Sequence, residues 1–157
     1  MSILISVNPP YAGLLVDGEK TIEWRKTSFP FGKAYIYETK KGGGSGLVIG
    51  EVEIAGAHLV DPNRRIKDFV ITAGCVTRDF LQQYAGGKPI WANFCINAKR
   101  YENPISLSDF ERPCPYKNNC IFCKYVDYGG QFEPPSCNYT DTMIIRAPQS
   151  WCYVEKN

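Results

Sequence analysis

Short segments in which hydrophobic and polar residues alternate are spread along most of the chain, and they predict β-strands joined by loops. Residues 3–7 alternate weakly and predict a first strand, and residues 33–39 predict an aromatic-rich strand with Tyr37 on the face opposite the aliphatic residues. Residues 47–59 are long enough for a bent strand, and residues 89–101 predict another long one. In this last strand the side chains expected to point inward are Ile90, Ala92, Phe94 and Ile96.

Two segments show the spacing of short amphipathic helices between residues that favour helix ends. In the first, we expect Asn8 to cap the helix, Pro9 to occupy its first position and Gly18 to end it. In the second, Thr77 is the expected cap and Gly86 the expected end. Several strands with two helices and no regular strand–helix alternation predict an α+β fold, a mixed and mostly antiparallel β-barrel with short helices packed at its ends.

The segment that follows the first helix gathers charged and aromatic residues in a very short span, residues 18–25. Because successive side chains of a strand point to opposite faces, Glu23 and Arg25 are expected on one face and Trp24 on the other. Lys20 lies two residues after Gly18, at the entry to this strand. One face of the strand is therefore polar and the other apolar, which is typical of a strand that borders a site.

The spacing G-x-K-x-x-E-x-R, filled by Gly18, Lys20, Glu23 and Arg25, resembles the signature of the ASCH domain family, a branch of the PUA-like superfamily. Residues 6–12 resemble the entry into the first helix of that family. Residues 35–39 and 48–54 resemble its two hairpin strands. The resemblance covers residues 2–103, followed by a cysteine-rich appendage. It implies a PUA-like barrel.

The resemblance also implies a cleft that binds RNA, either single-stranded or as a modified nucleoside. Lys20 and Arg25 would donate to phosphate or to base acceptors, and Glu23 would accept from a base amino group or hold Arg25 in place. The aromatic residues that are candidates for stacking on an unpaired base are Trp24, Tyr35, Tyr37 and Trp91. We therefore expect an RNA-binding module of RNA metabolism or transcription-linked regulation.

An enzymatic alternative stays open. Some small relatives are amidohydrolases of acetylated cytidine that use the motif lysine, a threonine three residues later and a glutamate ahead of the second helix, and ribonuclease activity has been attributed to others. This chain keeps Lys20, has Glu23 in place of the threonine, and offers no carboxylate in residues 70–74. Lys20 and Glu23 would form the catalytic pair of such an enzyme, but binding ranks ahead of hydrolysis.

Composition adds few constraints. A chain of 157 residues with 44% hydrophobic and 22% charged residues fits one globular domain. The net charge of +2 neither requires nor excludes a polyanionic partner, so contacts with nucleic acid must be local. One such place is the glycine-rich hairpin tip at residues 40–46, which begins with two lysines and either folds over a phosphate or forms a plain loop. No leader or membrane-spanning segment is evident, so we expect a cytoplasmic protein without a membrane partner.

After the predicted barrel of residues 1–103, residues 104–148 read as a loop-rich appendage and residues 149–157 as a strand that returns to the barrel. The appendage contains four cysteines whose central C-x2-C spacing suits a structural zinc ion: Cys114, Cys120, Cys123 and Cys137. In a reducing compartment zinc is favoured over disulfides, while free thiols are the remaining alternative. A third reading of the chain is a protein-interaction module that uses this loop.

Overall fold

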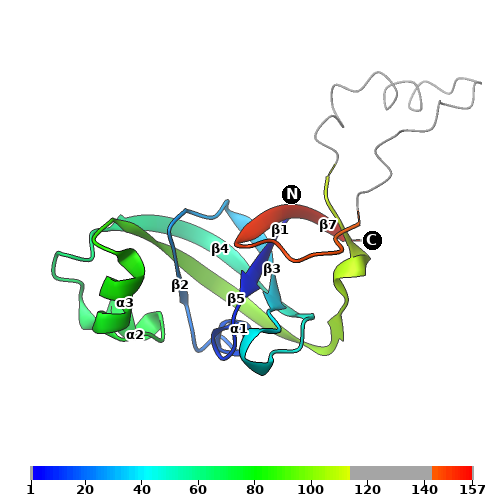
Figure 1. Cartoon of the computed structure of the whole chain (residues 1–157), viewed down its shortest axis with the longest axis horizontal. Coiled ribbons are helices and arrows are strands. Elements are labelled where there is room, and N and C mark those ends of the chain that lie inside the picture. The colour runs from blue at the N-terminus through cyan, green and yellow to red at the C-terminus, as the bar shows by residue number, and fades with distance from the viewer. Residues whose placement is uncertain (1, 114–142, 157) are drawn as a thin grey trace, which may run out of the picture.

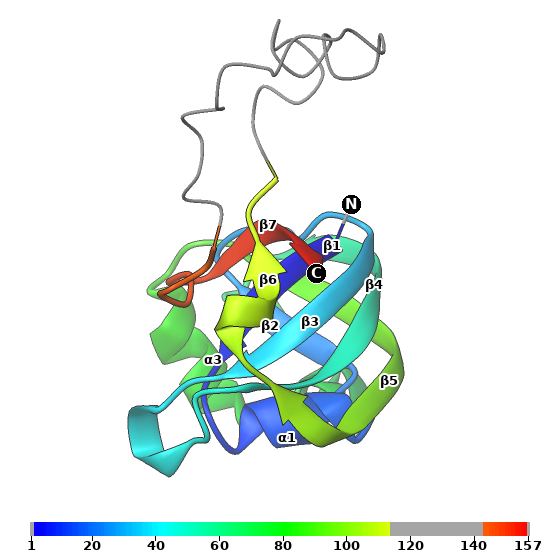
Figure 2. The same cartoon turned by 90° about the vertical axis from the view of Figure 1, so that its right-hand side faces the viewer.

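The structure, a computed structural model, describes residues 2–113 and 143–156 (Figure 1). Its strands form one mixed sheet in the order β2-β5-β4-β3-β1-β7-β6. The strand bounds are Ser2–Val7 (β1), Ile22–Arg25 (β2), Gly32–Glu38 (β3), Val48–Val60 (β4), Ile90–Ile105 (β5), Phe110–Glu111 (β6) and Trp151–Lys156 (β7). Only β1 and β3 pair in parallel; the other neighbours are antiparallel. The sheet curls around a common interior (Figure 2), but β2 and β6 are not paired with each other, so it is barrel-like and not closed.

Short helices pack against the curled sheet, as the sequence predicts. α1 spans Tyr11–Val16, α2 spans Asp68–Ala73 and α3 spans Arg78–Ala85. In Figure 1, α2 and α3 lie together at one end of the molecule, whereas α1 lies against the strands near its middle. Two 3-10 turns, Lys41–Gly43 and Leu107–Asp109, complete the described elements. The predicted α+β, barrel-like architecture is confirmed.

The ends of α3 are confirmed, but the cap predicted for α1 is wrong. The Thr77 side chain accepts a hydrogen bond from the backbone N–H of Phe80, and Gly86 adopts the left-handed conformation that ends α3. α1 begins after Pro10 and has no side-chain cap. The Asn8 side chain is engaged elsewhere, because its Oδ1 accepts from the Thr39 hydroxyl at 2.5 Å.

The core is divided because the central strands are covered on both faces. On β3, Ala34 and Ile36 pack into one buried cluster, while Tyr35 and Tyr37 pack into another. The alternation predicted for this strand is thus confirmed, with both faces buried. A third cluster joins β2 and β5 to α2 and α3.

The expectation that Ile90, Ala92, Phe94 and Ile96 of β5 all point inward is wrong for the last two of these residues. Ile90 and Ala92 are buried against α2 and α3, but Phe94 is 40% exposed and Ile96 is 46% exposed. All four residues occupy alternate positions of one strand, so the side-chain period itself is as predicted. The difference arises because the buried cluster that contains the two short helices includes only the beginning of β5.

A salt bridge fastens the end of α1 to β5. Arg100 donates from Nε to Oδ1 of Asp17 at 2.6 Å and from Nη2 to Oδ2 at 2.7 Å. The hydrogen bonds from Arg100 are the main cause that lowers the pKa of Asp17 below its ordinary value of 3.8. Such an exposed pair stabilises a fold by less than about 1 kcal/mol.

We expect Asp17→Asn to lower the free energy of unfolding by less than about 1 kcal/mol at neutral pH. A carboxyl whose pKa is lowered in the folded state stabilises above its unfolded pKa of 3.8, and this contribution is lost as the pH falls through the lower folded value. Urea unfolding at a series of pH values should therefore show the difference from wild type shrinking below pH 3.8. Glu19→Gln, at an exposed position, is the control, and a difference that grows with acid would contradict the assignment.

Candidate functional site

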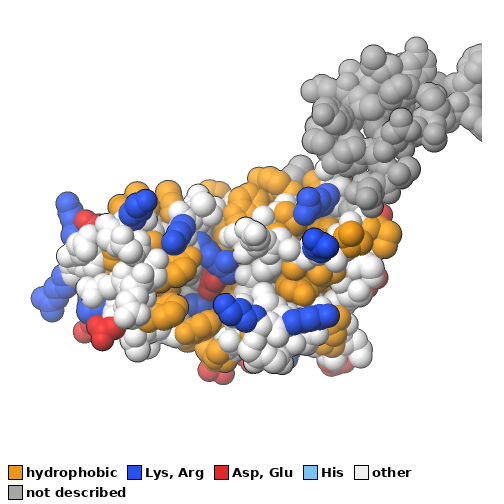
Figure 3. All heavy atoms as spheres, in the orientation of Figure 1, with side chains coloured by type: hydrophobic (Ala, Val, Ile, Leu, Met, Phe, Trp, Pro, Cys, Tyr) orange, Lys and Arg blue, Asp and Glu red, His pale blue; other side chains and the backbone are white. Residues whose placement is uncertain are grey.

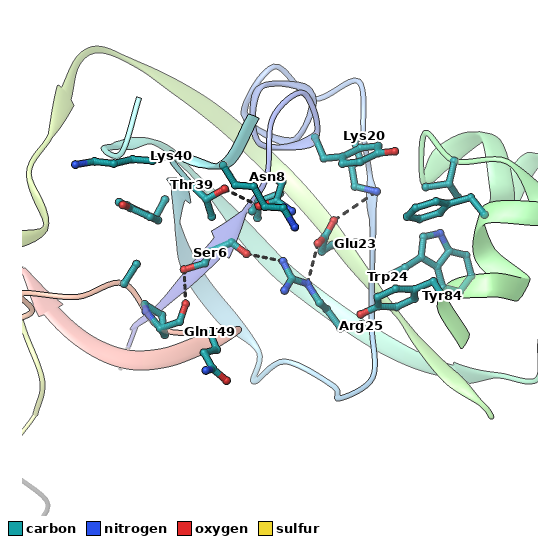
Figure 4. A pocket seen from close by; sticks show the side chains of 18 residues that line it. Ser6, Asn8, Lys20, Glu23, Trp24, Arg25, Thr39, Lys40, Tyr84 and Gln149 are labelled. Atoms are coloured by element: carbon teal, nitrogen blue, oxygen red, sulfur yellow. Dashed lines mark hydrogen bonds and ion pairs between the residues drawn. The ribbon is translucent and has the colours of Figure 1, made fainter. Parts of the chain in front are cut away.

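A cavity of about 500 Å³ opens between α1, α3, the strands β1 and β2, and the segment that precedes β7 (Figure 4). The motif strand β2 forms its back wall, and the loop after β3 reaches its rim. The lining residues are Ser6, Val7, Asn8, Tyr11, Lys20, Glu23, Trp24, Arg25, Tyr37, Thr39, Lys40, Lys41, Val76, Phe80, Tyr84, Ala147, Pro148 and Gln149.

Three charged side chains of the motif converge on this wall. Glu23 stands between two cations, with Oε2 at 3.4 Å from Nζ of Lys20 and Oε1 at 2.8 Å from Nε of Arg25. Lys20 also donates to the carbonyl of Gly74, and Arg25 donates from Nη2 to the carbonyl of Ser6 at 2.7 Å. Lys20 is only 3% exposed and Glu23 only 6%. The group is thus a buried network that carries one surplus positive charge.

Backbone pairing fixes the position of this network. β2 pairs with β5, so that Glu23 lies opposite Asn93, and the amide of Thr21 donates to the carbonyl of Ala73 at 2.9 Å. Asn93 is fully buried: its Oδ1 accepts from the amide of Phe29 at 2.7 Å, and its Nδ2 donates to the carbonyl of Glu23 at 3.1 Å. Asn93 therefore holds the strand that carries the motif to the chain that follows it.

Aromatic rings from the two helices flank the charged wall. The Phe80 and Tyr84 rings stack at 6.2 Å between centroids with an interplanar angle of 7°, and the Tyr11 ring lies 6.3 Å from that of Phe80. Nζ of Lys20 lies 5.4 Å from the centre of the Tyr11 ring. Burial raises the pKa of the Tyr84 phenol, which keeps it neutral. These rings offer flat surfaces beside cationic donors.

Trp24 lines the cavity from the other face of the motif strand, as the predicted alternation requires. Its side chain belongs to the buried cluster beneath α2 and α3. Its indole Nε1 is buried and has no hydrogen-bond partner among the described residues. It lies close against Gly74, where an added Cβ would come within 2.2 Å of Nε1. In the part of the chain that the structure describes, the indole N–H is therefore a buried donor without an acceptor, packed against Gly74.

Positive charge outweighs negative charge around the cavity. Its lining contains four cationic side chains and a single carboxylate, Glu23. Two of the cations are the motif residues, and the other two, Lys40 and Lys41, come from the short 3-10 turn and the residue before it at the rim. On the face of the molecule seen in Figure 3, Lys and Arg side chains are spread across the surface, while Asp and Glu side chains lie mostly at its edges. The cavity is suited to a ligand that is negatively charged or rich in acceptors.

Five of the six predicted ligand-binding residues line this cavity: Lys20, Glu23, Trp24, Arg25 and Tyr37. The sixth, Trp91, pairs with Arg25 across the strands and is not among the lining residues, so the structure does not bring it to this cavity. Sequence reasoning missed the wall formed by Ala147, Pro148 and Gln149. It also missed the rings of α1 and α3 as part of the site, because their helical spacing indicated only core packing.

The predicted zinc ligands Cys114, Cys120, Cys123 and Cys137 lie outside the described residues, so zinc stays a prediction from their spacing. In residues 2–113 and 143–156, no group of three or more His, Cys, Asp or Glu side chains is placed to hold a metal ion. None of the helices in these two ranges is long and apolar enough to cross a membrane.

Solved structures resemble this fold over nearly the whole chain. An ASCH protein from Zymomonas mobilis matches with a TM-score of 0.60 and 18% identity, covering 99% of this chain and 88% of that one. The chain has the ASCH-domain fold. Two variants of the same protein, one with tyrosine replaced by phenylalanine and one with serine replaced by alanine, match with TM-scores of 0.59 and 0.58, 18% identity, and coverage of 99% of this chain and 91% and 89% of theirs.

No protein-family model matches the sequence, and neither does any curated protein. At 18% identity the structural likeness establishes the ASCH fold alone. This likeness agrees with the resemblance of residues 18–25 to the ASCH signature. The evidence about function comes from the geometry of the cavity.

Proposed function

We propose that this ASCH-fold protein binds single-stranded RNA and holds one unpaired nucleotide, or the equivalent modified nucleoside, in the cavity of β2. The observation that carries the proposal is the buried network of Lys20, Glu23 and Arg25 on the wall of a cavity in which half of the lining residues are cationic or aromatic. Each part of the proposed ligand has a matching group in this lining.

The network has donors left for a ligand. Arg25 carries five N–H donors, of which the contacts to Glu23 and Ser6 use two, and the Lys20 ammonium has three, engaged by Gly74 and Glu23. The acceptor oxygens of Glu23, by contrast, already face both cations. An entering group that supplies acceptors, such as a phosphate or the carbonyl edge of a base, would therefore find unsatisfied donors on Arg25 and Lys20.

The size and the rings of the cavity favour an unpaired base. A volume of about 500 Å³ lies within the usual range for small-molecule sites and suits one nucleotide unit, whereas a duplex would not enter it. The rings of Tyr11, Phe80 and Tyr84 provide stacking surfaces, which are typically worth about 1–3 kcal/mol per base. Lys40 and Lys41 at the rim are placed to meet the phosphates of the adjoining strand.

Fluorescence anisotropy with a short labelled single-stranded RNA tests the proposal. We expect Arg25→Ala to weaken binding at least tenfold, because it removes the donors that reach the cavity, and Arg25→Lys to recover only part of the affinity. Lys33→Ala is the matched control, since Lys33 is an exposed cation that pairs with Glu51 outside the cavity. Circular dichroism verifies that each variant is folded. Equal affinity of wild type and Arg25→Ala would refute the site.

One observation favours hydrolysis of a modified nucleoside as a second candidate. Lys20 and Glu23 lie side by side on the cavity wall, which brings together the two residues that would form the catalytic pair of such an enzyme. The thiol of Cys95 behind this pair is not a competing nucleophile, because burial raises its pKa to about 12. Incubation with acetylated cytidine distinguishes the candidates: acetate release that Lys20→Ala abolishes would establish an enzyme, and its absence would leave binding alone.

A further inference from the structure

A second hollow, of about 870 Å³, lies between α2 and the strands β4 and β5. We call it the α2 groove and define it by Leu59, Arg65, Phe69, Phe94 and Ile96 together with the residues between them that line it. It shares no lining residue with the cavity of the motif. Thr21 and Ile22 at the start of β2 lie on its floor, so the motif strand separates the two hollows.

The groove contains the part of the apolar face of β5 that α2 and α3 do not bury. Phe94 and Ile96 follow Ala92 on this face and stay largely exposed. Leu59, at 48% exposure, and Phe69, at 68% exposure, extend the apolar surface on β4 and α2. Soluble proteins seldom leave a contiguous surface of this kind uncovered unless it contacts a partner.

The rim of the groove is cationic. Its charged lining residues are Arg64, Arg65, Lys67 and the single carboxylate Asp61. Arg64 lies 3.6 Å from Asp61, whereas neither Arg65 nor Lys67 forms an ion pair within residues 2–113 and 143–156. Nζ of Lys67 lies 5.9 Å from the centre of the Phe69 ring, which places positive charge directly beside the apolar surface.

We propose that the α2 groove docks an acidic amphipathic segment of a partner protein, with apolar side chains in the groove and carboxylates against Arg65 and Lys67. The apolar floor would bury the apolar side chains of such a segment, and the unpaired cations would pair with its carboxylates. A second copy of this chain would bring the same positive rim against itself. RNA would place the polar edges of its bases against Ile22, Val60 and Val70, aliphatic side chains that offer them no hydrogen bonds.

Calorimetry with synthetic peptides tests the docking. The probe is a helical peptide of about 15 residues with leucines at i, i+3, i+4 and i+7 and glutamates elsewhere; the controls are the same composition with the stripe scrambled and the same stripe with lysines in place of glutamates. We expect the acidic striped peptide to bind at least tenfold tighter than either control. Phe69→Ala should weaken it at least fivefold, and Ile145→Ala, an equally exposed apolar position outside the groove, should not.

The charges are tested by two matched double variants. Arg65→Ala with Lys67→Ala should weaken the acidic peptide at least fivefold at low salt, whereas Lys99→Ala with Lys156→Ala removes the same charge from exposed positions elsewhere and should change binding less than twofold. Because the two hollows share no residue, Phe69→Ala should leave RNA binding at the cavity unchanged, and Arg25→Ala should leave peptide binding unchanged.

Three results would overturn the proposal. One is equal binding of the striped and scrambled peptides, or acidic-peptide binding that Phe69→Ala does not weaken. Another is a short single-stranded RNA whose affinity falls in Phe69→Ala, which would make the groove an extension of a nucleic-acid surface. The third is a concentration-dependent dimer in sedimentation that Phe69→Ala disrupts, which would make the occupant a second copy of the chain.

Discussion

Replacing Glu23 by alanine is expected to lower the free energy of unfolding by about 3–5 kcal/mol. The substitution leaves the buried Lys20 ammonium and the Arg25 guanidinium side by side without the carboxylate that lies between them. Their remaining acceptors are the backbone carbonyls of Gly74 and Ser6, which carry no full charge. Urea denaturation followed by tryptophan fluorescence measures the loss.

A control variant and a double mutant test the expectation for Glu23. Glu19→Ala removes an exposed carboxylate just before the motif strand and should change stability by no more than about 0.5 kcal/mol. Lys20→Met combined with Glu23→Gln removes one charge of each sign, so it should be less damaging than the sum of the two single changes. A loss of under about 1 kcal/mol in Glu23→Ala would show that the network is hydrated and does not behave as a buried group.

The second large effect is expected at Asn93. Replacing it with leucine keeps a side chain of similar size but removes the side-chain hydrogen bonds: the amide of Phe29 is left buried without its acceptor, and the carbonyl of Glu23, which faces residue 93 across the paired strands, loses one donor. A buried unsatisfied group costs about 1–3 kcal/mol and a lost hydrogen bond about 1 kcal/mol, so we expect a total loss of about 2–4 kcal/mol in urea unfolding. Asn63→Leu, at an exposed position of the same residue type, is the control.

The Asn93 variant also bears on ligand binding. The Phe29 ring lies 5.8 Å from the guanidinium carbon of Arg25, so releasing the Phe29 backbone should loosen Arg25 and reduce RNA affinity in protein that is still folded. If Asn93→Leu were as stable as wild type, water would have to replace the hydrogen bonds of the Asn93 side chain, and the expected loss would be contradicted.

The sequence was sufficient to predict those helix ends and strand faces that depend only on residues close together in the chain. Thr77 and Gly86 delimit α3 because a cap needs only residues within one turn. The alternation in β2 placed Glu23 and Arg25 on one face, and the structure links them by a hydrogen bond. α2 begins after Lys67, which is not a capping residue, so no cap signal in the sequence marks its start.

What the sequence could not reveal depends on contacts between distant segments. The carbonyls that receive Lys20 and Arg25 belong to residues 54 and 19 positions away, and no side-chain pattern marks a carbonyl as an acceptor. Trp91 has the composition of a stacking residue, yet strand pairing leaves it outside the cavity. Phe94 and Ile96 continue the apolar alternation of β5, but the packing of α2 and α3 determines which residues of that face are buried.

The cavity joins the two ends of the described chain. The amide of Ser6 donates to the carbonyl of Ser150 at 2.9 Å, and the Ser6 hydroxyl donates to the carbonyl of Pro148 at 2.6 Å, across 142 positions of sequence. This wall therefore exists only when β7 has joined β1, so a molecule held there recognises the complete fold and no partly folded form. By thermodynamic linkage, any occupant present above its Kd raises the free energy of unfolding of the whole chain.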